Sequence, residues 1–340
     1  MGLEKIVTDL KEKRVLVTGG AGFIGSHIVD MLLDESCTEI VVIDNMVRGR
    51  PENLAYAMAR GPVRLVNGDI RDTKLMTTLV QAADIVFHQA ALRITHCVAE
   101  PRLAMAVMVQ STFDLLELCV THNVERVVAA SSASVYGTAE EFPTTEGQHS
   151  YNNRTLYGAA KAFNEGLLRT FNEMYGLDYV AFRYFNVYGP RMDIHGRYTE
   201  VLIRWMECID AGQAPIIFGD GRHIMDFVHV QDVAIANILG AKSRICDEVF
   251  NVAIGVETTL LQLAQSLIKV MGRDGLDPVF APERSVNPVP RRLASTSKAE
   301  KLLGFRARIS LEDGLRGLVD WWRVERHRTG AAVQPKAAAS

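Results

Sequence analysis

A glycine-rich stretch near the N-terminus, residues 18–25, most constrains the fold of this chain. It follows an apolar segment, 14–17, and leads into a helical pattern of apolar residues. Nineteen residues after Gly25, Asp44 ends a second apolar segment, 40–43. A dinucleotide site needs this order, because glycines let the backbone approach the pyrophosphate, a helix N-terminus supplies N–H donors, and a carboxylate accepts the ribose hydroxyls. We therefore predict a dinucleotide-binding unit here.

The same part of the chain indicates which dinucleotide is bound. A carboxylate at Asp44 accepts hydrogen bonds from a free 2′-hydroxyl and repels a 2′-phosphate, so NAD is favoured over NADP. Arg48 and Arg50 keep NADP open, because a nearby arginine can accommodate that phosphate. The predicted NAD-binding residues of this segment are Gly19, Gly22, Phe23, Ile24, Gly25, Asp44 and Asn45.

Composition and charge restrict the function classes. The 340 residues are 48% apolar and carry a formal net charge of -3, which gives no basic face for nucleic acid. We expect no membrane segment, because the apolar runs look too short to cross a bilayer and the N-terminus lacks the apolar core of a signal peptide. The five scattered cysteines and nine histidines predict neither disulfides nor a metal site, so a cytoplasmic protein is expected.

Apolar segments alternate with helical patterns through the first half of the chain. Strands are expected at 14–18, 39–44, 63–67, 84–88, 126–131 and 178–184, and helices at 23–34, 101–122 and 155–175. Because the strand segments are mostly short Val/Ile/Leu runs without polar alternation, they are typical of strands buried on both faces. The predicted fold class is α/β, with a doubly wound parallel sheet of the Rossmann type in a first domain of residues 1–184.

Beyond residue 184 the expected elements become shorter. We predict a smaller mixed α/β lobe over residues 185–328 that faces the substrate, with parts of 220–260 crossing back to the first domain. Residues 329–340 are small and polar, and we expect this tail to be disordered.

A tyrosine and a lysine four residues apart are the candidate reacting groups. Tyr157 and Lys161 share one face of an expected helix, and a cation beside a phenol favours the phenolate, which is the better base. Taken alone, such a pair is more often a surface contact. Ser132, however, follows an expected strand, at the edge where open α/β sheets bind ligands. We therefore predict that Tyr157, Lys161 and Ser132 are catalytic.

The chain resembles the extended short-chain dehydrogenase/reductase family, and within it the nucleotide-sugar epimerases of the UDP-galactose 4-epimerase type. The resemblance spans about residues 14–325. Besides the motifs above, it rests on the sequences NGDI, HQAA, RYFNVYGP, DFVHVQDV and SKAEKLLGF, at residues 67–70, 88–91, 183–190, 226–233 and 297–305.

The resemblance implies roles for the matched residues. The implied cofactor contacts are Asp69 and Ile70 beside the adenine, Ala90 and Ala91 beside the nicotinamide, and Tyr157 and Lys161. The implied substrate contacts are Ser132, Ser134, Tyr157, Asn186, Ile216, Phe218 and Arg292. The implied partners are a UDP-sugar and a second copy of the chain, joined through the long helices near 101–122 and 155–175.

The implied reaction is a cycle and not a net oxidation. Tyr157 removes the C4 hydroxyl proton as hydride leaves C4 for bound NAD, the 4-keto sugar turns over, and the hydride returns to its other face. NAD is then a retained catalyst, so tight cofactor binding is expected.

Several positions separate related reactions. Sugar 4,6-dehydratases carry an Asp-Glu pair where this chain has Ala133 and Ser134, and neither residue can protonate a leaving hydroxyl. UDP-glucuronate decarboxylases usually keep a glutamate at the second position, so both activities are disfavoured. Met225 replaces a family arginine that holds the diphosphate; Arg222 or His223 could compensate, or could be solvated loop residues.

Arg292 falls, by spacing, where a residue gates the hexose pocket. It could bind the carboxylate of a uronic acid bidentately. The interpretation we favour at this point is a loop arginine that faces water or binds the diphosphate. The sugar is therefore open between a UDP-hexose and a UDP-uronic acid. The alternatives to a 4-epimerase are a 4-ketosugar reductase, another nucleotide-sugar epimerase and, with less support, a non-catalytic dinucleotide sensor.

Overall fold

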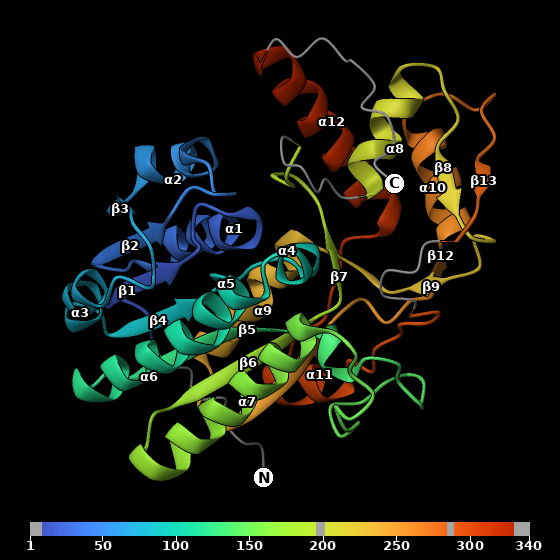
Figure 1. Ribbon diagram of the computed structural model, residues 1–340. Helices are drawn as coiled ribbons and strands as arrows, with labels where there is room; N and C mark the ends of the chain where they lie inside the picture. Colours follow the sequence, from blue (N-terminus) through green and yellow to red (C-terminus); the bar gives the residue numbers. More distant parts are fainter. Residues whose placement is uncertain (1–8, 195–200, 284–288, 330–340) are drawn as a thin grey trace.

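A seven-stranded parallel sheet forms the centre of the protein (Figure 1). The computed structural model describes residues 9–194, 201–283 and 289–329. The strand order is β11-β6-β5-β4-β1-β2-β3, and each pairing is parallel. The strands are β1 (Arg14–Thr18), β2 (Glu39–Asp44), β3 (Val63–Asn67), β4 (Ile85–His88), β5 (Arg126–Ser132), β6 (Tyr179–Tyr184) and β11 (Glu248–Val252). The predicted doubly wound α/β fold is confirmed.

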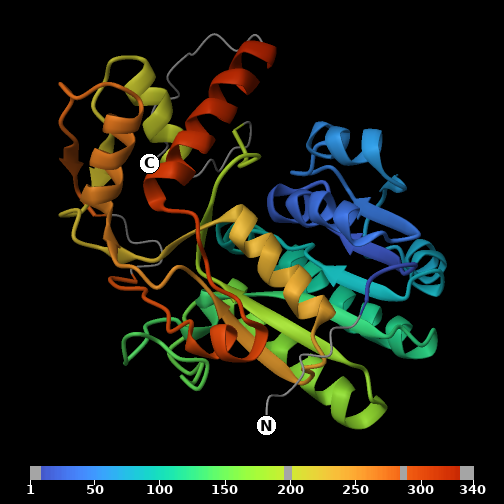
Figure 2. The ribbon, with the colours of Figure 1, turned by 180° about the vertical axis from the view of Figure 1, so that it is seen from behind.

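Helices cover both faces of this sheet, as the opposite views in Figures 1 and 2 show. One face packs against α1 (Phe23–Leu32), α2 (Ala55–Arg60), α9 (Val230–Lys242) and α11 (Ser297–Leu303). The other face packs against α3 (Thr73–Gln81), α6 (Ser111–Thr121) and α7 (Leu156–Tyr175). Within β1, Val15 and Val17 join the first core and Leu16 the second, because successive side chains of a strand point to opposite faces. Strands without polar alternation therefore suit this sheet.

The run between β4 and β5 is not the single α-helix that was predicted at 101–122. After α4 (Ile94–Ala99) it consists of α5 (Pro101–Ala104), a π-helical segment (Met105–Gln110) and α6. Inside the π-helical segment, the Met108 carbonyl accepts hydrogen bonds from Asn164 Nδ2 at 2.7 Å and from the Thr112 hydroxyl at 2.8 Å. The irregular turn is thus bonded to α7, the helix that carries the predicted catalytic pair.

The same run corrects a second expectation. Within the described residues, the helical run Pro101–Thr121 is long and apolar enough to cross a membrane by length and composition, with a mean hydropathy of 1.6. The expectation that the apolar runs are too short for this is therefore wrong. In this fold the run lies along the sheet, where Leu115, Leu116 and Cys119 of α6 are buried in the core beneath α3 and α7.

A second hydrophobic core lies beyond the carboxyl edge of the sheet. It is formed by α8 (Val201–Asp210), α10 (Leu260–Val270) and α12 (Leu311–Thr329), whose fully buried residues include Trp322. Three two-stranded sheets accompany these helices: β7 (Asn186–Tyr188) with β10 (Phe227–His229), β8 (Ile216–Phe218) with β13 (Val279–Ala281), and β9 (Ile224–Met225) with β12 (Thr258–Thr259). Short 3₁₀ turns occur at Leu33–Glu35, Pro51–Leu54 and Ala133–Tyr136.

The chain passes between the two cores more than once. It leaves the large sheet after β6, returns to it for α9 and β11, and leaves again for α10. Segments between residues 185 and 328 therefore contribute to both cores, while the domain boundary at residue 184 stays a prediction. Residues 330–340 of the predicted tail lie outside the described residues.

Candidate active site

The predicted site residues gather along one edge of the large sheet. Parallel strands end at the same edge, and open α/β sheets bind ligands there. Six predicted residues stand at or just after the ends of β1 to β6: Gly19, Asp44, Asp69, Ala90, Ser132 and Asn186. The topology thus places residues that are far apart in the sequence along one line.

The glycine turn after β1 leaves room only for backbone. Gly19 has a φ of +67°, and a Cβ on it would lie 2.8 Å from both the Cα and the nitrogen of Ala90. A Cβ on Gly25 would collide with the Gly19 carbonyl oxygen. Gly22 is the N-cap residue of α1 and brings no side chain to that helix end. A pyrophosphate can therefore approach the N–H groups of the first turn of α1, where Phe23 and Ile24 lie.

Asp44 lies at the end of β2 and faces this turn. Its carboxylate accepts hydrogen bonds from the backbone nitrogens of Ala21 at 3.2 Å and Met46 at 3.0 Å. Burial raises the pKa of Asp44, and the backbone N–H groups oppose that rise. A Cβ on Gly49 would collide with the carboxylate, so the loop after β2 closes tightly over it. The carboxylate is held where a ribose would meet the glycine turn.

A second acidic residue extends this end of the site. Asn45 Nδ2 donates a 3.3 Å hydrogen bond to Asp69, which Arg71 holds through its side chain and its backbone nitrogen. These bonds, led by the Arg71 side chain, lower the pKa of Asp69 to about 2. Beside it, Ile70 packs half-buried against the core under α3. The four residues predicted for the adenosine end therefore lie together.

The two arginines that kept NADP open have acidic partners. Arg48 lies 3.5 Å from Asp193, and Arg50 lies 3.6 Å from Glu52. Each guanidinium is thus paired with a carboxylate, whereas the Asp44 carboxylate remains at the ribose position. This arrangement favours NAD.

The predicted catalytic residues converge where β5 meets α7. Thr155 caps α7 by accepting a hydrogen bond from Gly158 at 3.1 Å, which places Tyr157 in the first turn. Ser132 ends β5, and its side chain acts on the phenol of Tyr157 and lowers the pKa of that phenol. Lys161 is buried one turn further, and its Nζ donates a 2.5 Å hydrogen bond to the Ala130 carbonyl. Strand and helix are therefore joined one turn beyond the phenol.

The electrostatics of this cluster come mainly from burial. Burial raises the pKa of Tyr157, while the Ser132 side chain and the positive charges of Arg292 and Arg48 lower it. Burial also lowers the pKa of Lys161 to about 8, against the opposing effect of Glu165. The lysine anchors α7 through Ala130, and an arginine from the second lobe supplies a positive charge that acts on the phenol.

The nicotinamide end connects to the same cluster. The backbone nitrogen of Ala90 donates a 3.3 Å hydrogen bond to the Thr18 hydroxyl. Ala91 and Tyr157 both pack against a small core that contains Cys97 and Met108. The residues predicted for the nicotinamide and for the sugar hydroxyl thus share one wall.

The remaining substrate residues come from three segments. Ser134 is buried in the turn after β5 and donates its N–H to Ser132 Oγ at 3.1 Å. Asn186 of β7 is half-buried and donates to the Asp226 carbonyl at 3.1 Å. On β8, Ile216 is 39% exposed and Phe218 is half-buried, so both remain accessible to a flat ring.

Arg292 points inward, which corrects the interpretation as a loop arginine facing water. Its backbone nitrogen donates to the Ile224 carbonyl at 2.8 Å, and its charge acts on Tyr157. Burial lowers the pKa of its guanidinium. Its Nε atom is buried and has no hydrogen-bond partner within the described part of the chain. Arg291, by contrast, turns away and pairs with Glu257.

The two candidates for replacing the missing arginine at Met225 each lie beside an acidic residue. The side chain of Arg222 is 89% exposed and lies 3.7 Å from Asp220. His223 lies 3.4 Å from Glu283. Arg222 agrees with the interpretation as a solvated loop residue, whereas the His223 side chain is only 20% exposed and lies against Glu283.

Two buried residues support the site and were given no role from the sequence. His88 ends β4, with Nδ1 2.8 Å from the Thr18 hydroxyl and Nε2 3.1 Å from the Thr112 hydroxyl. Asp226 accepts backbone hydrogen bonds from two loops of the second lobe. His88 could have been singled out as a polar residue in a mainly apolar strand and as the first residue of the HQAA motif.

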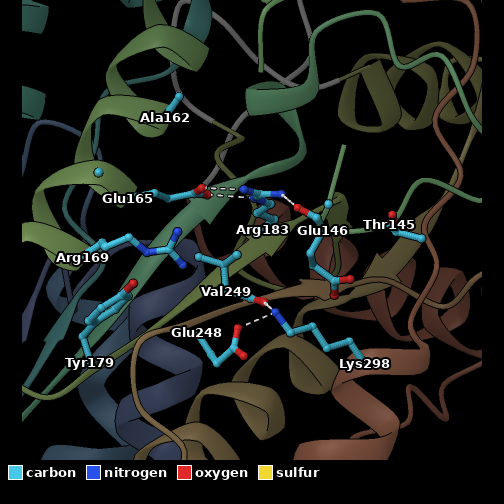
Figure 3. Close-up of a pocket in the computed structure, with 12 residues that line it drawn as sticks. Thr145, Glu146, Ala162, Glu165, Arg169, Tyr179, Arg183, Glu248, Val249 and Lys298 are labelled. Atoms are coloured by element: carbon cyan, nitrogen blue, oxygen red, sulfur yellow. Dashed lines mark hydrogen bonds and ion pairs between the residues drawn. The ribbon is translucent and has the colours of Figure 1, made fainter. Parts of the chain in front are cut away.

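A cavity of about 410 Å³ lies beside the same helix but away from the predicted chemistry (Figure 3). It is reached from the side of α7 that carries Ala162, Glu165 and Arg169. Its charged side chains pair with one another: Arg183 lies 2.6 Å from Glu165, and Lys298 lies 2.5 Å from Glu248. None of the predicted substrate residues lines it, so we do not assign the sugar to this cavity.

Comparison with known proteins identifies the family. The model of the NAD dependent epimerase/dehydratase family matches residues 15–253. The chain belongs to this family. The resemblance inferred from the motifs is confirmed, and the protein is an NAD-dependent enzyme of the epimerase/dehydratase family. The glycine turn after β1 fits NAD, because a Cβ there would occupy the space that the pyrophosphate needs. Asp44 fits NAD as well, because it offers a carboxylate to the ribose.

Similar family members cover nearly the whole chain. The UDP-glucose 4-epimerase of Mycolicibacterium smegmatis is 34% identical over 313 residues, 91% of this chain and 98% of that protein. The crystal structure of the Thermotoga maritima UDP-glucose 4-epimerase with UDP-glucose is 35% identical, with a TM-score of 0.85, and covers 92% of this chain and 99% of its own. The UDP-N-acetylglucosamine 4-epimerase of Methanobrevibacter ruminantium M1, in complex with UDP-N-acetylmuramic acid, is 36% identical, with a TM-score of 0.87 and coverages of 93% and 99%.

The family also contains other reactions. A dTDP-glucose 4,6-dehydratase of Actinoplanes sp. is 31% identical over 321 residues, 92% of this chain and 98% of that protein. Similarity alone therefore leaves the reaction open among family members, and the residues of the site must discriminate.

Proposed function

We propose that this family member is a UDP-sugar 4-epimerase that retains its NAD. The observation that carries the proposal is the convergence of Ser132, Tyr157 and Lys161 between β5 and α7. Bound NAD would accept a hydride from C4 of the sugar and return it. Tyr157 would take the proton of the C4 hydroxyl and give it back, Ser132 would orient that hydroxyl, and Lys161 would hold the helix in place.

The turn after β5 argues against a dehydratase. Expelling water across C5 and C6 needs an acid and a base near those carbons. The two residues after Ser132 are Ala133 and Ser134, which are 3% and 8% exposed and carry no titratable group. The chain therefore resembles dehydratases in its fold but lacks an acid and a base at positions 133 and 134.

Cofactor content and a substrate panel test the proposal. Purified protein should contain NAD(H) in near-stoichiometric amount and interconvert a UDP-sugar with its C4 epimer without added cofactor. Protein that is free of cofactor and consumes added NADPH with a 4-ketosugar would instead identify the alternative, a reductase. Tight NAD binding with no turnover of any UDP-sugar would favour a dinucleotide sensor.

Within the UDP-sugars, we propose an acidic sugar as the substrate. Arg292 is directed at the Tyr157 end of the site, and its buried Nε has no partner within the described residues. A buried N–H donor without a partner is costly unless a ligand accepts from it, and a planar carboxylate matches the geometry of a guanidinium. One of the solved relatives is in complex with UDP-N-acetylmuramic acid, so an acidic UDP-sugar is compatible with this fold.

Substitution of Arg292 tests the substrate class. In Arg292→Leu, KM for a UDP-uronic acid should rise about 10- to 100-fold, the range expected for a charge-assisted hydrogen bond, while KM for UDP-glucose and the affinity for UDP alone stay within a few-fold. Arg291→Leu is the matched control, because that arginine pairs with Glu257. An equal loss of affinity for UDP alone would show that Arg292 holds the diphosphate instead.

We also propose that the protein is cytoplasmic and forms a homodimer. The helices near the predicted interface expose Met105, Phe163, Met174 and Tyr175, each between 46% and 62%. All five cysteines are free thiols, which suits a reducing compartment. Light scattering after gel filtration should give a dimer, and Phe163→Glu should give a monomer.

A further inference from the structure

Asp226 joins three segments that surround the predicted sugar site. It lies between β9 and β10 and is 0% exposed. Its carboxylate accepts hydrogen bonds from the backbone nitrogens of Ile254 at 3.0 Å, Gly255 at 3.0 Å and Ala294 at 3.2 Å. Its own carbonyl oxygen accepts from both the backbone and the side-chain nitrogen of Asn186, each at 3.1 Å. One residue therefore fixes β7, the loop after β11 and the segment before α11.

Two of these segments carry predicted substrate contacts. Asn186 begins β7, and Arg292 lies two residues before Ala294. The Arg292 nitrogen donates to the carbonyl of Ile224, which is two residues before Asp226. The segment that carries Arg292 is thus bonded at both of its ends to the short chain 224–226. Its position relative to Asn186 depends on that chain and on Thr144, whose backbone bonds to Leu293 and Ser295.

Asp226 places a carboxylate in the interior of the protein. Its three carboxylate partners are backbone N–H groups. Burial raises its pKa to about 6, and the three backbone hydrogen bonds act against that rise. An ionised carboxylate binds N–H donors more strongly than an amide does, although its burial is costly. The carboxylate therefore holds the three N–H groups more firmly than an asparagine would.

We propose that Asp226 is a positioning residue of the nucleotide-sugar pocket, which holds the segment bearing Arg292 at a fixed place opposite Asn186 before substrate arrives. The inference rests on the proposed function, because it assigns Arg292 and Asn186 to the substrate. Asp226 acts through these residues and does not itself touch the sugar.

Asp232 offers a matched control. It is 1% exposed, lies in the first turn of α9, and its carboxylate accepts hydrogen bonds from the backbone nitrogens of Arg308 at 3.2 Å and Ile309 at 3.1 Å. The chemistry matches that of Asp226, but the segment it holds leads into α12 and carries no predicted substrate contact. Any general cost of neutralising a buried carboxylate should appear in both variants.

The experiment compares Asp226→Asn with Asp232→Asn, both purified with bound NAD. Asp226→Asn should weaken binding of the preferred UDP-sugar at least tenfold by calorimetry and raise KM to the same degree, while kcat changes less than threefold and NAD content stays the same. Asp232→Asn should lower the melting temperature without changing KM by more than twofold. Equal KM values in the wild type and Asp226→Asn, or equal KM increases in the two variants, would overturn the positioning role.

A measurement on the wild type covers the case in which Asp226→Asn does not fold. Hydrogen exchange at the amide of Ala294 should be slow in the enzyme without sugar, and addition of the UDP-sugar should slow it little further. An amide that exchanges freely until the sugar is added would show that substrate, and not Asp226, orders the segment. If the wild type binds no UDP-sugar in the panel, the proposed function fails, and this inference fails with it.

Discussion

The Nζ atom of Lys161 donates a 2.5 Å hydrogen bond to the carbonyl oxygen of Ala130. Ala130 lies two residues before the end of β5, so this bond joins α7 to the strand that presents Ser132. Tyr157 stands one helical turn before the lysine, and the side chain of that serine acts on its phenol. The lysine bond thus fixes the turn of α7 that carries the phenol beside β5. A base held in this way needs little reorganisation before it meets a hydroxyl.

Removal of the phenol oxygen tests this arrangement most directly. In Tyr157→Phe the ring still packs against the small core that contains Cys97 and Met108, so we expect an unchanged fold, an unchanged NAD content and a kcat lower by about 10²- to 10⁴-fold. Tyr175→Phe, at the exposed end of the same helix, is the control and should retain full activity. Near-normal turnover by Tyr157→Phe would mean that another group takes the proton.

Substitution of Asp44, the predicted ribose ligand, should weaken NAD binding and leave UDP-sugar binding nearly unchanged. Asp44→Ala removes the carboxylate that binds Ala21 and faces the ribose position, so NAD affinity should fall at least tenfold while UDP-sugar affinity stays within twofold. Asp72→Ala is the control, because Asp72 caps α3 through Lys74 and Leu75 and should cost only stability, about 1 kcal/mol. Calorimetry with NAD on cofactor-stripped protein would measure both; equal NAD affinity in Asp44→Ala and wild type would show that the anchor is misplaced.

The sheet could be predicted from the sequence because its strands carry a local signal. All six predicted strands match the structure to within one residue at each end. Each is a short, mainly apolar run without polar alternation, and such runs are typical of strands buried on both faces. The position of β11 at the sheet edge has no such local signal, because its pairing with β6 joins residues some seventy positions apart.

The parts that could not be predicted depend on contacts between distant residues. The π-helical turn at Met105–Gln110 is stabilised from α7, where Asn164 binds Met108, and no local pattern reports that bond. Arg292 turns inward because Ile224 and Asp226 hold the segment around it. Spacing placed this arginine near the pocket, but not the direction of its side chain.

Two Gly→Ala substitutions, one in the glycine turn after β1 and one in α7, should have opposite effects on stability. Gly19→Ala places a methyl group 2.8 Å from the Ala90 backbone at a φ of +67°, so we expect a loss of at least about 1–3 kcal/mol in stability and loss of bound NAD. Gly166→Ala, within α7, adds a methyl group with nothing within 4 Å, and should raise stability by about 0.5–1 kcal/mol. Urea unfolding measures both, and a stabilised Gly19→Ala would contradict the close approach of the two turns.

His88 predicts how stability depends on pH. Burial, reinforced by the charge of Lys161, lowers the pKa of His88 from 6.5 to about 3. Below pH 6.5 the unfolded chain therefore binds a proton that the folded protein does not, so stability is lost as the pH falls from 6.5 towards 3. At pH 5 the loss from this one residue is about 2 kcal/mol relative to pH 8.

Comparison with His88→Gln isolates this residue from other groups whose pKa values are shifted. Burial lowers the pKa of His27 to about 3, which acts in the same direction, while the raised pKa of Asp226 acts in the opposite one. These contributions cancel when the two proteins are compared at each pH. Because glutamine does not titrate, the free-energy advantage of the wild type over His88→Gln should shrink by about 2 kcal/mol between pH 8 and pH 5 in urea unfolding. A difference that stays constant over this range would mean that His88 is charged in the folded protein. Both ring nitrogens of His88 would then donate hydrogen bonds to the two threonine hydroxyls.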